Sequence, residues 1–251
     1  MSLEKSLLLK KVLKYPCNII TSSWLKKSGI SNQLQYKYKQ NGWLQSVGQG
    51  AFKKFCTDKI SLEDAIYALQ KSDLKIPVGG YSALLLKGKN HYIRLKNKWS
   101  IFSNRAIKLP KWFEKYHFPD EWVHYKTSFL QANIGLETFK INNLDIEISS
   151  LERALFELLY LVPKDISLQE AYEIYELLTT LRPKLLQELL DSCSSIKVKR
   201  LFLYLAEKFN YSWFKYLNLK EVNLGSGVRE LNKKGHFDKK YNLVIEDREN
   251  E

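Results

Sequence analysis

The chain has 251 residues, of which 45% are hydrophobic and 13% aromatic, so it can form a buried core and is not expected to be disordered. It has no apolar run near the roughly 20 residues that cross a bilayer, and its N-terminal segment has no small-residue cleavage site, so we expect a cytoplasmic protein. The three cysteines form no C-x-x-C pair and the four histidines are scattered, so we expect reduced thiols, no metal and no other cofactor.

The net charge of +13 is unevenly distributed along the chain. Residues 1–56 contain ten lysines, no arginine and one glutamate, a net charge of +9. Residues 87–115 have a net charge of +8, whereas residues 116–251 have 18 basic and 21 acidic residues, a net charge of −3. This asymmetry favours a polyanionic partner for the front half. The basic segments lack the Trp/Phe/Leu face of helices that lie on membranes, so no membrane partner is expected.

The N-terminal segment reads as helix, helix, turn, helix and hairpin. Apolar residues among the lysines of 4–14 predict a first helix. Thr21 or Ser22 caps a short second helix, and Ser31 caps a third, NQLQYKYKQN. WLQSV and AFKKF, joined by GQG, predict a hairpin with a glycine turn. This order and the positive charge predict a winged helix-turn-helix, rather than a helical bundle with a surface hairpin.

The rest of the chain predicts mixed helices and strands, followed by a helical bundle. Ser61 and Asp64 form a capping-box pattern at the start of SLEDAIYALQK, and GGYSALLLKG is predicted to be a helix bounded by glycines. HYIRLK, KWSIFS, EWVHYKT, LETFKI and LDIEIS predict an antiparallel sheet, with a short helix beginning at Pro110. Capping boxes at Ser149–Glu152 and Ser167–Glu170 begin the helical part, and VNLG and KYNLVIEDR read as strands.

These elements define the predicted architecture. We predict an α+β protein with a winged helix-turn-helix DNA-binding domain over residues 1–75. Residues 76–251 are predicted to form a C-terminal α+β domain with an antiparallel sheet and a helical bundle.

The third helix is the predicted reading helix. Leu34 and Tyr38 are four residues apart and face the core. Glutamine pairs bidentately with adenine, lysine reaches guanine, and reading helices contact bases mainly from their N-terminal residues. The predicted base contacts are therefore Asn32, Gln33, Gln35, Tyr36 and Lys37. The alternative is that these residues form a solvated helix face, and Tyr36 fits either reading.

Two further sets of polar residues are predicted to bind the nucleic-acid backbone. Hydroxyls, lysines and helix N-termini bind phosphates without reading sequence. The predicted phosphate and wing contacts are Thr21, Ser22, Ser23, Lys26, Lys27, Lys39, Gln49, Lys53 and Lys54. The second basic cluster consists of Lys87, Lys89, Arg94, Lys96, Lys98, Arg105 and Lys108. Three interpretations of this cluster are open. It extends the surface that binds DNA, it binds RNA, or its lysines protect the edge of a sheet.

Two enzyme-like patterns in the sequence are incomplete. LGSG at 224–227 matches the Gly-Ser signature of nucleotidyltransferases, but no D-x-D pair follows it to hold Mg²⁺. Asp58 or Asp64 with Asp73 and Lys75 matches a nuclease-like set, but the first two acids lie at a helix start instead of converging from strands. We therefore expect a protein that is not an enzyme.

A family resemblance covers most of the chain. Its motifs occur in the order NGWLQSVGQGAFKK, VGGYSALLLKGKNHYIRL, LPKWF, SLERALFELLYLVPKD, LLTTLRPKLLQELLDSCSSIKVKRLFLYLAEK and VNLGSGVRELNKKGHFDKKYNLVI. They resemble the AbiE-type (AbiEi) antitoxins of type IV toxin–antitoxin and phage-defence systems, also called abortive-infection systems. Gln49 departs from this pattern, because a basic residue is expected at the wing tip of many relatives.

The resemblance implies a transcriptional regulator with two activities. The winged helix would bind inverted repeats of double-stranded DNA in the protein's own promoter and repress its operon. The C-terminal region would counteract a nucleotidyltransferase toxin from the same operon, without a stable complex. Two alternatives stay open: an RNA-binding protein that acts on the toxin's target, and a stoichiometric inhibitor that binds the toxin through the helices after Ser149.

Overall fold

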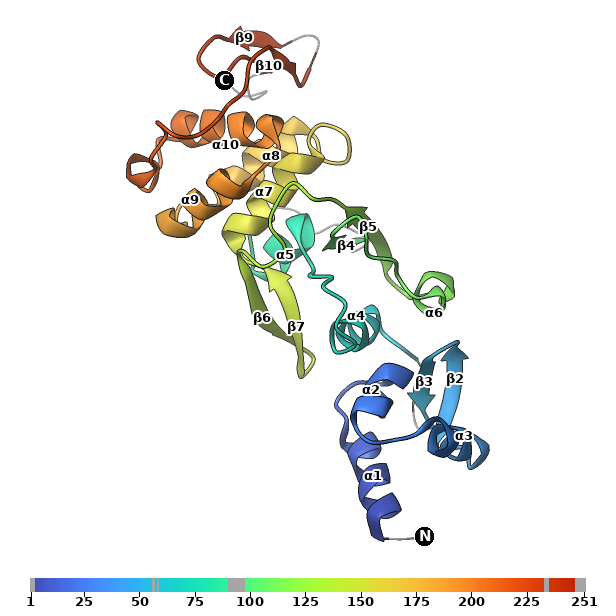
Figure 1. The fold of residues 1–251 in the computed structure, drawn as a ribbon. Coiled ribbons are helices and arrows are strands. Elements are labelled where there is room, and N and C mark those ends of the chain that lie inside the picture. The colour runs from blue at the N-terminus through green and yellow to red at the C-terminus, as the bar shows by residue number, and fades with distance from the viewer. Residues whose placement is uncertain (1–2, 56, 58, 90–97, 233–234, 247–251) are drawn as a thin grey trace.

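The computed structural model describes residues 3–55, 57, 59–89, 98–232 and 235–246. The chain runs from an N-terminal helical head at one end of an elongated molecule to a group of helices at the other end (Figure 1). Between them lie α4, α6 and two pairs of strands (Figure 1). The parts of the molecule thus follow one another in space in the order of the sequence, and the basic N-terminal head lies far from the C-terminal helices (Figure 1).

The N-terminal head is a winged helix-turn-helix, as predicted. Its elements are α1 (Leu3–Lys14), β1 (Ile19–Thr21), α2 (Ser22–Lys27), α3 (Asn32–Gln40), β2 (Leu44–Gly48) and β3 (Ala51–Lys54). The strands form an antiparallel sheet in the order β1-β3-β2. The hairpin β2–β3 was expected from the sequence, whereas the short strand β1 was not.

Local capping explains where the head's helices begin. The Thr21 side chain accepts a hydrogen bond from the backbone N–H of Trp24 at 3.2 Å, so Thr21 is the N-cap of α2. Ser31 does the same for α3, accepting from the N–H of Leu34 at 3.3 Å. Gly29 between the two helices has a φ of +86°, a left-handed conformation that favours glycine. The predicted caps are confirmed here because each needs only residues close in sequence.

Helix α4 (Leu62–Gln70) joins the head to the rest of the molecule. Ser61 and Asp64 form the predicted capping box. The Asp64 carboxylate also accepts a hydrogen bond from the backbone N–H of Asn18 at 2.9 Å. This bond links α4 to the residue before β1. One hydrophobic core extends from Val12 of α1 through α4 to Ile148, so packing crosses the predicted boundary between residues 75 and 76. That boundary stays a prediction.

The middle of the chain forms two strand pairs. Its elements are α5 (Gly80–Leu86), β4 (Lys98–Ser103), α6 (Lys111–Lys115), β5 (Glu121–Lys126), β6 (Leu136–Ile141) and β7 (Leu144–Ser149). β6 and β7 are antiparallel as expected, but β4 and β5 are parallel, which corrects part of the predicted sheet. Parallel strands need a crossover connection, and the segment that contains α6 supplies one. The predicted strand HYIRLK lies outside the described residues.

The C-terminal part is a helical bundle with a small sheet on top (Figure 1). Its elements are α7 (Leu151–Leu161), α8 (Leu168–Glu176), α9 (Pro183–Ser192), α10 (Ile196–Lys208), the 3₁₀ helix η1 (Phe214–Tyr216), β8 (Arg229–Glu230), β9 (His236–Asp238) and β10 (Leu243–Ile245). The predicted strand VNLG is irregular, whereas KYNLVIEDR contains β10. The overall α+β class is as predicted.

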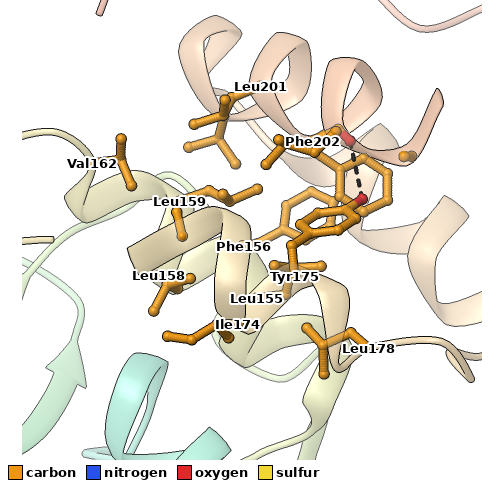
Figure 2. Close-up of a cluster of buried hydrophobic side chains, with 14 of the residues drawn as sticks. Leu155, Phe156, Leu158, Leu159, Val162, Ile174, Tyr175, Leu178, Leu201 and Phe202 are labelled. Carbon is orange, nitrogen blue, oxygen red and sulfur yellow. Dashed lines mark hydrogen bonds between the residues drawn. The ribbon is translucent and has the colours of Figure 1, made fainter. Parts of the chain in front are cut away.

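Helix α7 is the centre of the bundle. Leu155, Phe156 and Leu159 are fully buried between α7 and its neighbours (Figure 2). The Tyr175 hydroxyl of α8 donates to the Phe202 carbonyl of α10 at 3.1 Å, so this buried polar atom is paired (Figure 2). None of the helices in the described residues is long and apolar enough to span a membrane.

Candidate nucleic-acid interface

Helix α3 has one buried face and one exposed polar face. Tyr38 is buried with Leu34 packed beside the same core, as predicted. Four exposed residues at i, i+3, i+4 and i+7 form a stripe along the helix, which we call the reading stripe: Gln33, Tyr36, Lys37 and Gln40. Asn32 is also exposed, at the start of the helix. The stripe therefore presents amide, phenol and ammonium groups together.

Two features of the reading stripe bear on the predicted contacts. Tyr36 is 59% exposed, which places it with the stripe and not with the core. Its hydroxyl accepts a hydrogen bond from Gln40 Nε2 at 2.8 Å. Gln40 was missing from the predicted site, although its place seven residues after Gln33 is enough to put it on the same face.

Gln35 is buried and does not lie on the exposed face of α3. Its side chain is 4% exposed, and Oε1 accepts from the Ser22 hydroxyl at 2.7 Å. Its Nε2 donates to the Ile30 carbonyl at 3.0 Å. Both ends of the amide are thus used inside the head, where Gln35 joins α2 to α3. The predicted base contact for Gln35 conflicts with this position, and we assign Gln35 a positioning role.

The wing is held from both sides. Gln49 is exposed at its tip, and the Gly50 carbonyl accepts from the Ser22 backbone N–H at 2.8 Å, which fixes the tip against the start of α2. A Cβ atom on Gly48 would lie 2.7 Å from Cβ of Trp112 in α6, so β2 packs directly on the middle of the molecule. The wing therefore lies beside α3 and is held by contacts with α2 and α6.

The predicted phosphate contacts divide into exposed and internal residues. The side chains of Ser23, Lys26, Lys27, Lys39 and Gln49 are exposed. Ser22 is half-buried through its bond to Gln35, and half-buried Lys53 donates to the Thr57 carbonyl at 2.9 Å. Lys27 pairs with the exposed carboxylate of Asp73. The exposed residues lie on α2, on α3 and at the wing tip.

Thr21 and Lys54 are internal, which conflicts with their predicted phosphate contacts. Thr21 is 5% exposed, and its hydroxyl serves as a helix cap and bonds to Ser72 Oγ at 2.7 Å. Lys54 is 8% exposed, and its ammonium donates to the Leu13 carbonyl at 3.4 Å and to the Tyr15 carbonyl. Lys54 thus satisfies carbonyls at the end of α1.

The second basic cluster is only partly a basic surface. Lys87 forms an ion pair with Glu137, and burial lowers the pKa of its ammonium, so this charge is matched inside the fold. Arg94 and Lys96 lie outside the described residues. Lys98, Arg105 and Lys108 are exposed, and Lys89 is half-buried. The described members of the cluster therefore form a smaller basic surface than the sequence suggests.

The enzyme-like patterns have structural roles in this fold. The LGSG loop wraps a guanidinium: buried Arg200 donates to the carbonyls of Leu224 at 2.7 Å, Gly225 at 3.1 Å and Gly227 at 2.6 Å. Asp64 caps α4, and Asp73 pairs with Lys27; Asp58 is outside the described part of the chain. In the described residues, no group of three or more His, Cys, Asp or Glu side chains is placed to hold a metal ion.

Comparison with known proteins agrees with this architecture. Curated proteins gave no match. The crystal structure of the RV2827C protein from Mycobacterium tuberculosis is similar, with a TM-score of 0.58 and 13% identity over 97% of this chain and 92% of that one, which shows a shared fold. Residues 7–95 match the family described as transcriptional regulator, AbiEi antitoxin N-terminal domain. Residues 96–246 match transcriptional regulator, AbiEi antitoxin, type IV TA system. The chain therefore belongs to the AbiEi antitoxin family of transcriptional regulators of type IV toxin–antitoxin systems.

Proposed function

We propose that the protein represses its own operon by binding inverted repeats in its promoter, and counteracts a nucleotidyltransferase toxin encoded beside it. The observation that carries the DNA-binding part is the reading stripe on α3. Its amides and ammonium group are the chemical groups that pair with adenine and guanine edges in the major groove. The stripe belongs to a segment, residues 1–56, whose net charge is +9 and which suits a polyanion.

In the proposed complex, α3 enters the major groove and the exposed residues around it contact phosphates. Ser23 and Lys26 on α2 and Lys39 on α3 bind the backbone on either side of the groove. The wing tip carries Gln49 and the turn glycine Gly50, so it approaches the backbone through hydrogen bonds and not through charge. Gln35 orients α3 from beneath.

A gel-shift titration of a promoter fragment at several salt concentrations tests this assignment. We expect Lys37→Ala to weaken promoter binding by about 1–3 kcal/mol if the ammonium reads a base. If it pairs with a phosphate, the salt slope should fall by about one unit. Lys164→Ala, which removes one exposed lysine far along the chain, is the matched control and should bind like the wild type. Unchanged binding and salt slope for Lys37→Ala would contradict the DNA contact assigned to Lys37.

The antitoxin part is tested separately from repression. When the protein is expressed from an unrelated promoter, Lys37→Ala should still restore growth of cells that express the toxin, because the C-terminal part is proposed to carry antitoxicity. Loss of rescue would show that DNA binding and antitoxicity cannot be separated. Co-purification of toxin and antitoxin would favour direct inhibition over action without a stable complex.

A further inference from the structure

A cavity of about 310 Å³ lies beside the turn that follows α4. Its walls come from the segment after α4, from the carboxyl ends of the parallel strands β4 and β5, and from α7. The apolar part of the lining consists of Leu74, Pro77, Phe102, Ile107, Phe129 and Leu130. A volume near 300 Å³ with apolar walls and a few polar groups is typical of sites for small organic molecules.

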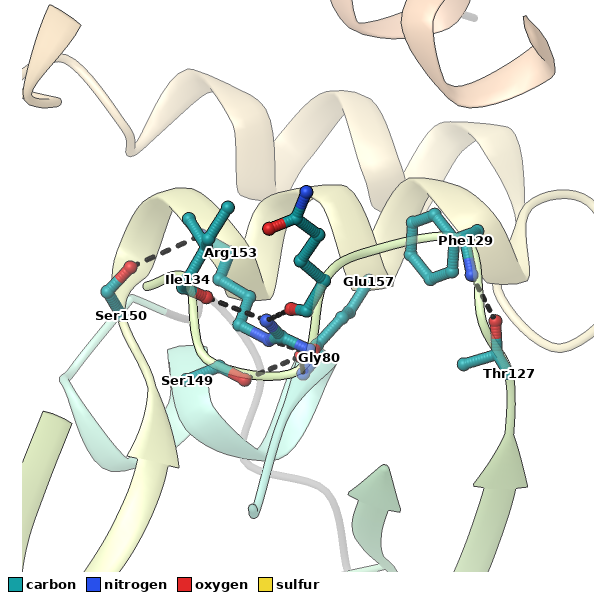
Figure 3. A network of polar contacts seen from close by, with 9 residues as sticks. Gly80, Thr127, Phe129, Ile134, Ser149, Ser150, Arg153 and Glu157 are labelled. Carbon is teal, nitrogen blue, oxygen red and sulfur yellow. Dashed lines mark hydrogen bonds and ion pairs between the residues drawn. The ribbon is translucent and has the colours of Figure 1, made fainter. Parts of the chain in front are cut away.

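One wall of the cavity contains a buried guanidinium group, and some of its N–H groups make no hydrogen bond within the described residues. Arg153 of α7 lines the cavity, and its side chain is 8% exposed. Nε donates to Glu157 Oε1 at 2.8 Å, and Nη1 donates to the carbonyls of Gln131 at 2.7 Å and Ile134 at 2.6 Å (Figure 3). Within the described part of the chain, no hydrogen bond uses Nη2.

The negative charge beside this arginine is already satisfied. Glu157 is fully buried, and its Oε2 accepts from the Gly80 backbone N–H at 2.8 Å and from the Ser149 hydroxyl at 2.7 Å (Figure 3). Asp73 at the cavity rim pairs with Lys27 outside the cavity. Exposed Lys75 also lines the cavity and adds a second cation. The cavity therefore favours a molecule that brings an anionic oxygen to Lys75 and Arg153 and an apolar ring to Phe102 and Phe129.

The same rim segment holds helix α2 at both of its ends. Ser72 Oγ bonds to Oγ1 of Thr21, the N-cap of α2, at 2.7 Å. The Asp73 carboxylate pairs with Lys27 in the last turn of α2. Asp73 has a φ of +65°, in the left-handed region that Asp adopts more readily than most residues other than glycine. The next two residues, Leu74 and Lys75, line the cavity.

We propose that this cavity binds a small aromatic carboxylate, and that its occupancy is transmitted to α2 through residues 72–75. The ring packs on the apolar walls, and the carboxylate accepts hydrogen bonds from Lys75 and from Nη2 of Arg153. A ligand that contacts Leu74 and Lys75 shifts the turn that positions α2, and so changes how α2 and α3 meet DNA. The ligand site stands on the cavity alone, whereas the coupling rests on the proposed DNA binding.

Calorimetric titration of the full chain with 1-naphthoate, in the absence of DNA, tests the site. We expect saturable binding, and binding at least about tenfold weaker for 1-naphthalenemethanol, which has the same ring system and no charge. Lys75→Met removes the mouth cation and Ala132→Phe fills the cavity from an exposed lining position; each should weaken 1-naphthoate by at least about tenfold. Lys164→Met is the matched control and should bind normally. No saturable binding, or full affinity in Ala132→Phe with unchanged thermal stability, would overturn the site.

Promoter affinity measured with and without saturating 1-naphthoate tests the coupling. The wild type should show a change of at least about threefold, and Ser72→Ala a smaller one, because Ser72 links the rim to α2 without lining the cavity. Binding of 1-naphthoate with no change in promoter affinity would overturn the coupling and leave the site intact. Failure of promoter binding itself, with 1-naphthoate still bound, would count against the proposed function and not against the site.

Discussion

Gln35 lies beneath the reading stripe, where one amide bonds to α2 and to the turn before α3. Gln35→Ala removes both bonds, to the Ser22 hydroxyl and the Ile30 carbonyl, and leaves buried polar groups unpaired. We expect it to lower the free energy of unfolding by about 1–3 kcal/mol. Gln33→Ala, on the exposed face of the same helix, should change it by no more than about 0.5 kcal/mol. Urea denaturation measures both; equal stability of the two variants would contradict the assigned role of Gln35.

His124 of β5 is half-buried, and its Nε2 lies 2.6 Å from the Ser103 hydroxyl at the end of β4. Burial lowers the pKa of His124 from 6.5 to about 4, with nearby Lys126 adding to the effect. Because the folded pKa is depressed for a cationic acid, the unfolded chain binds more protons between these two values. The contribution of His124 to stability is therefore complete above pH 6.5 and is lost as the pH falls towards 4.

A variant that cannot titrate isolates this effect. His124→Gln keeps a polar group beside Ser103, and its unfolding free energy should fall less between pH 7 and pH 5 than that of the wild type. Exposed His117, changed to Gln, is the control and should follow the wild type. If His124→Gln loses as much stability as the wild type over this interval, the depressed pKa is contradicted.

At the scale of helices and strands, the internal ion pair of α7 holds several elements together. Glu157 bonds to the first residue of α5 and the last residue of β7, and Arg153 bonds to the loop before β6 (Figure 3). Arg153→Met leaves a buried carboxylate without its partner, and should lower the free energy of unfolding by about 3–5 kcal/mol. The double variant with Glu157→Met should recover part of that loss. A double-mutant cycle measures the pair; additive losses would contradict the coupling.

Helix starts were predictable when their caps depended on nearby residues. Thr21, Ser31 and Ser61 bond to backbone groups three residues later, which the sequence displays. The cap of α7 was predicted one residue early, because Ser149 donates to Glu157 and leaves Ser150 to accept from the N–H of Arg153. That choice depends on a tertiary contact, which no local pattern contains.

The exposed face of α3 was predictable from the sequence, whereas the burial of Gln35 and Lys54 was not. Helix periodicity gives the face that contains Gln33 and Lys37. It does not show that Gln35 meets Ser22, or that Lys54 meets the Tyr15 carbonyl 39 positions earlier. Such partners are set by how α1, α2 and β3 pack. The direction of β5 beside β4 likewise depends on a crossover, and hydrophobic alternation contains no information about it.

For the whole molecule, the sequence shows the uneven distribution of charge. It does not show how the winged helix packs against the middle of the molecule. Gln70 at the end of α4 donates to the Glu147 carbonyl of β7 at 2.9 Å and accepts from its N–H at 2.8 Å, although the two residues are 77 positions apart. Gly48 packs on Trp112 from the other side. The winged helix therefore contacts the middle of the molecule through α4 and through β2.

We propose that the reading stripe of α3 distinguishes DNA sequences. Affinities of the wild type and Gln33→Ala for the promoter fragment and for an unrelated duplex of equal length, at one salt concentration, test it most directly. We predict that Gln33→Ala loses about 1–3 kcal/mol of binding free energy on the promoter and almost none on the unrelated duplex, because an amide that pairs with a base contributes only to specific binding. An equal loss on both duplexes, or no loss on either, would show that Gln33 does not read a base.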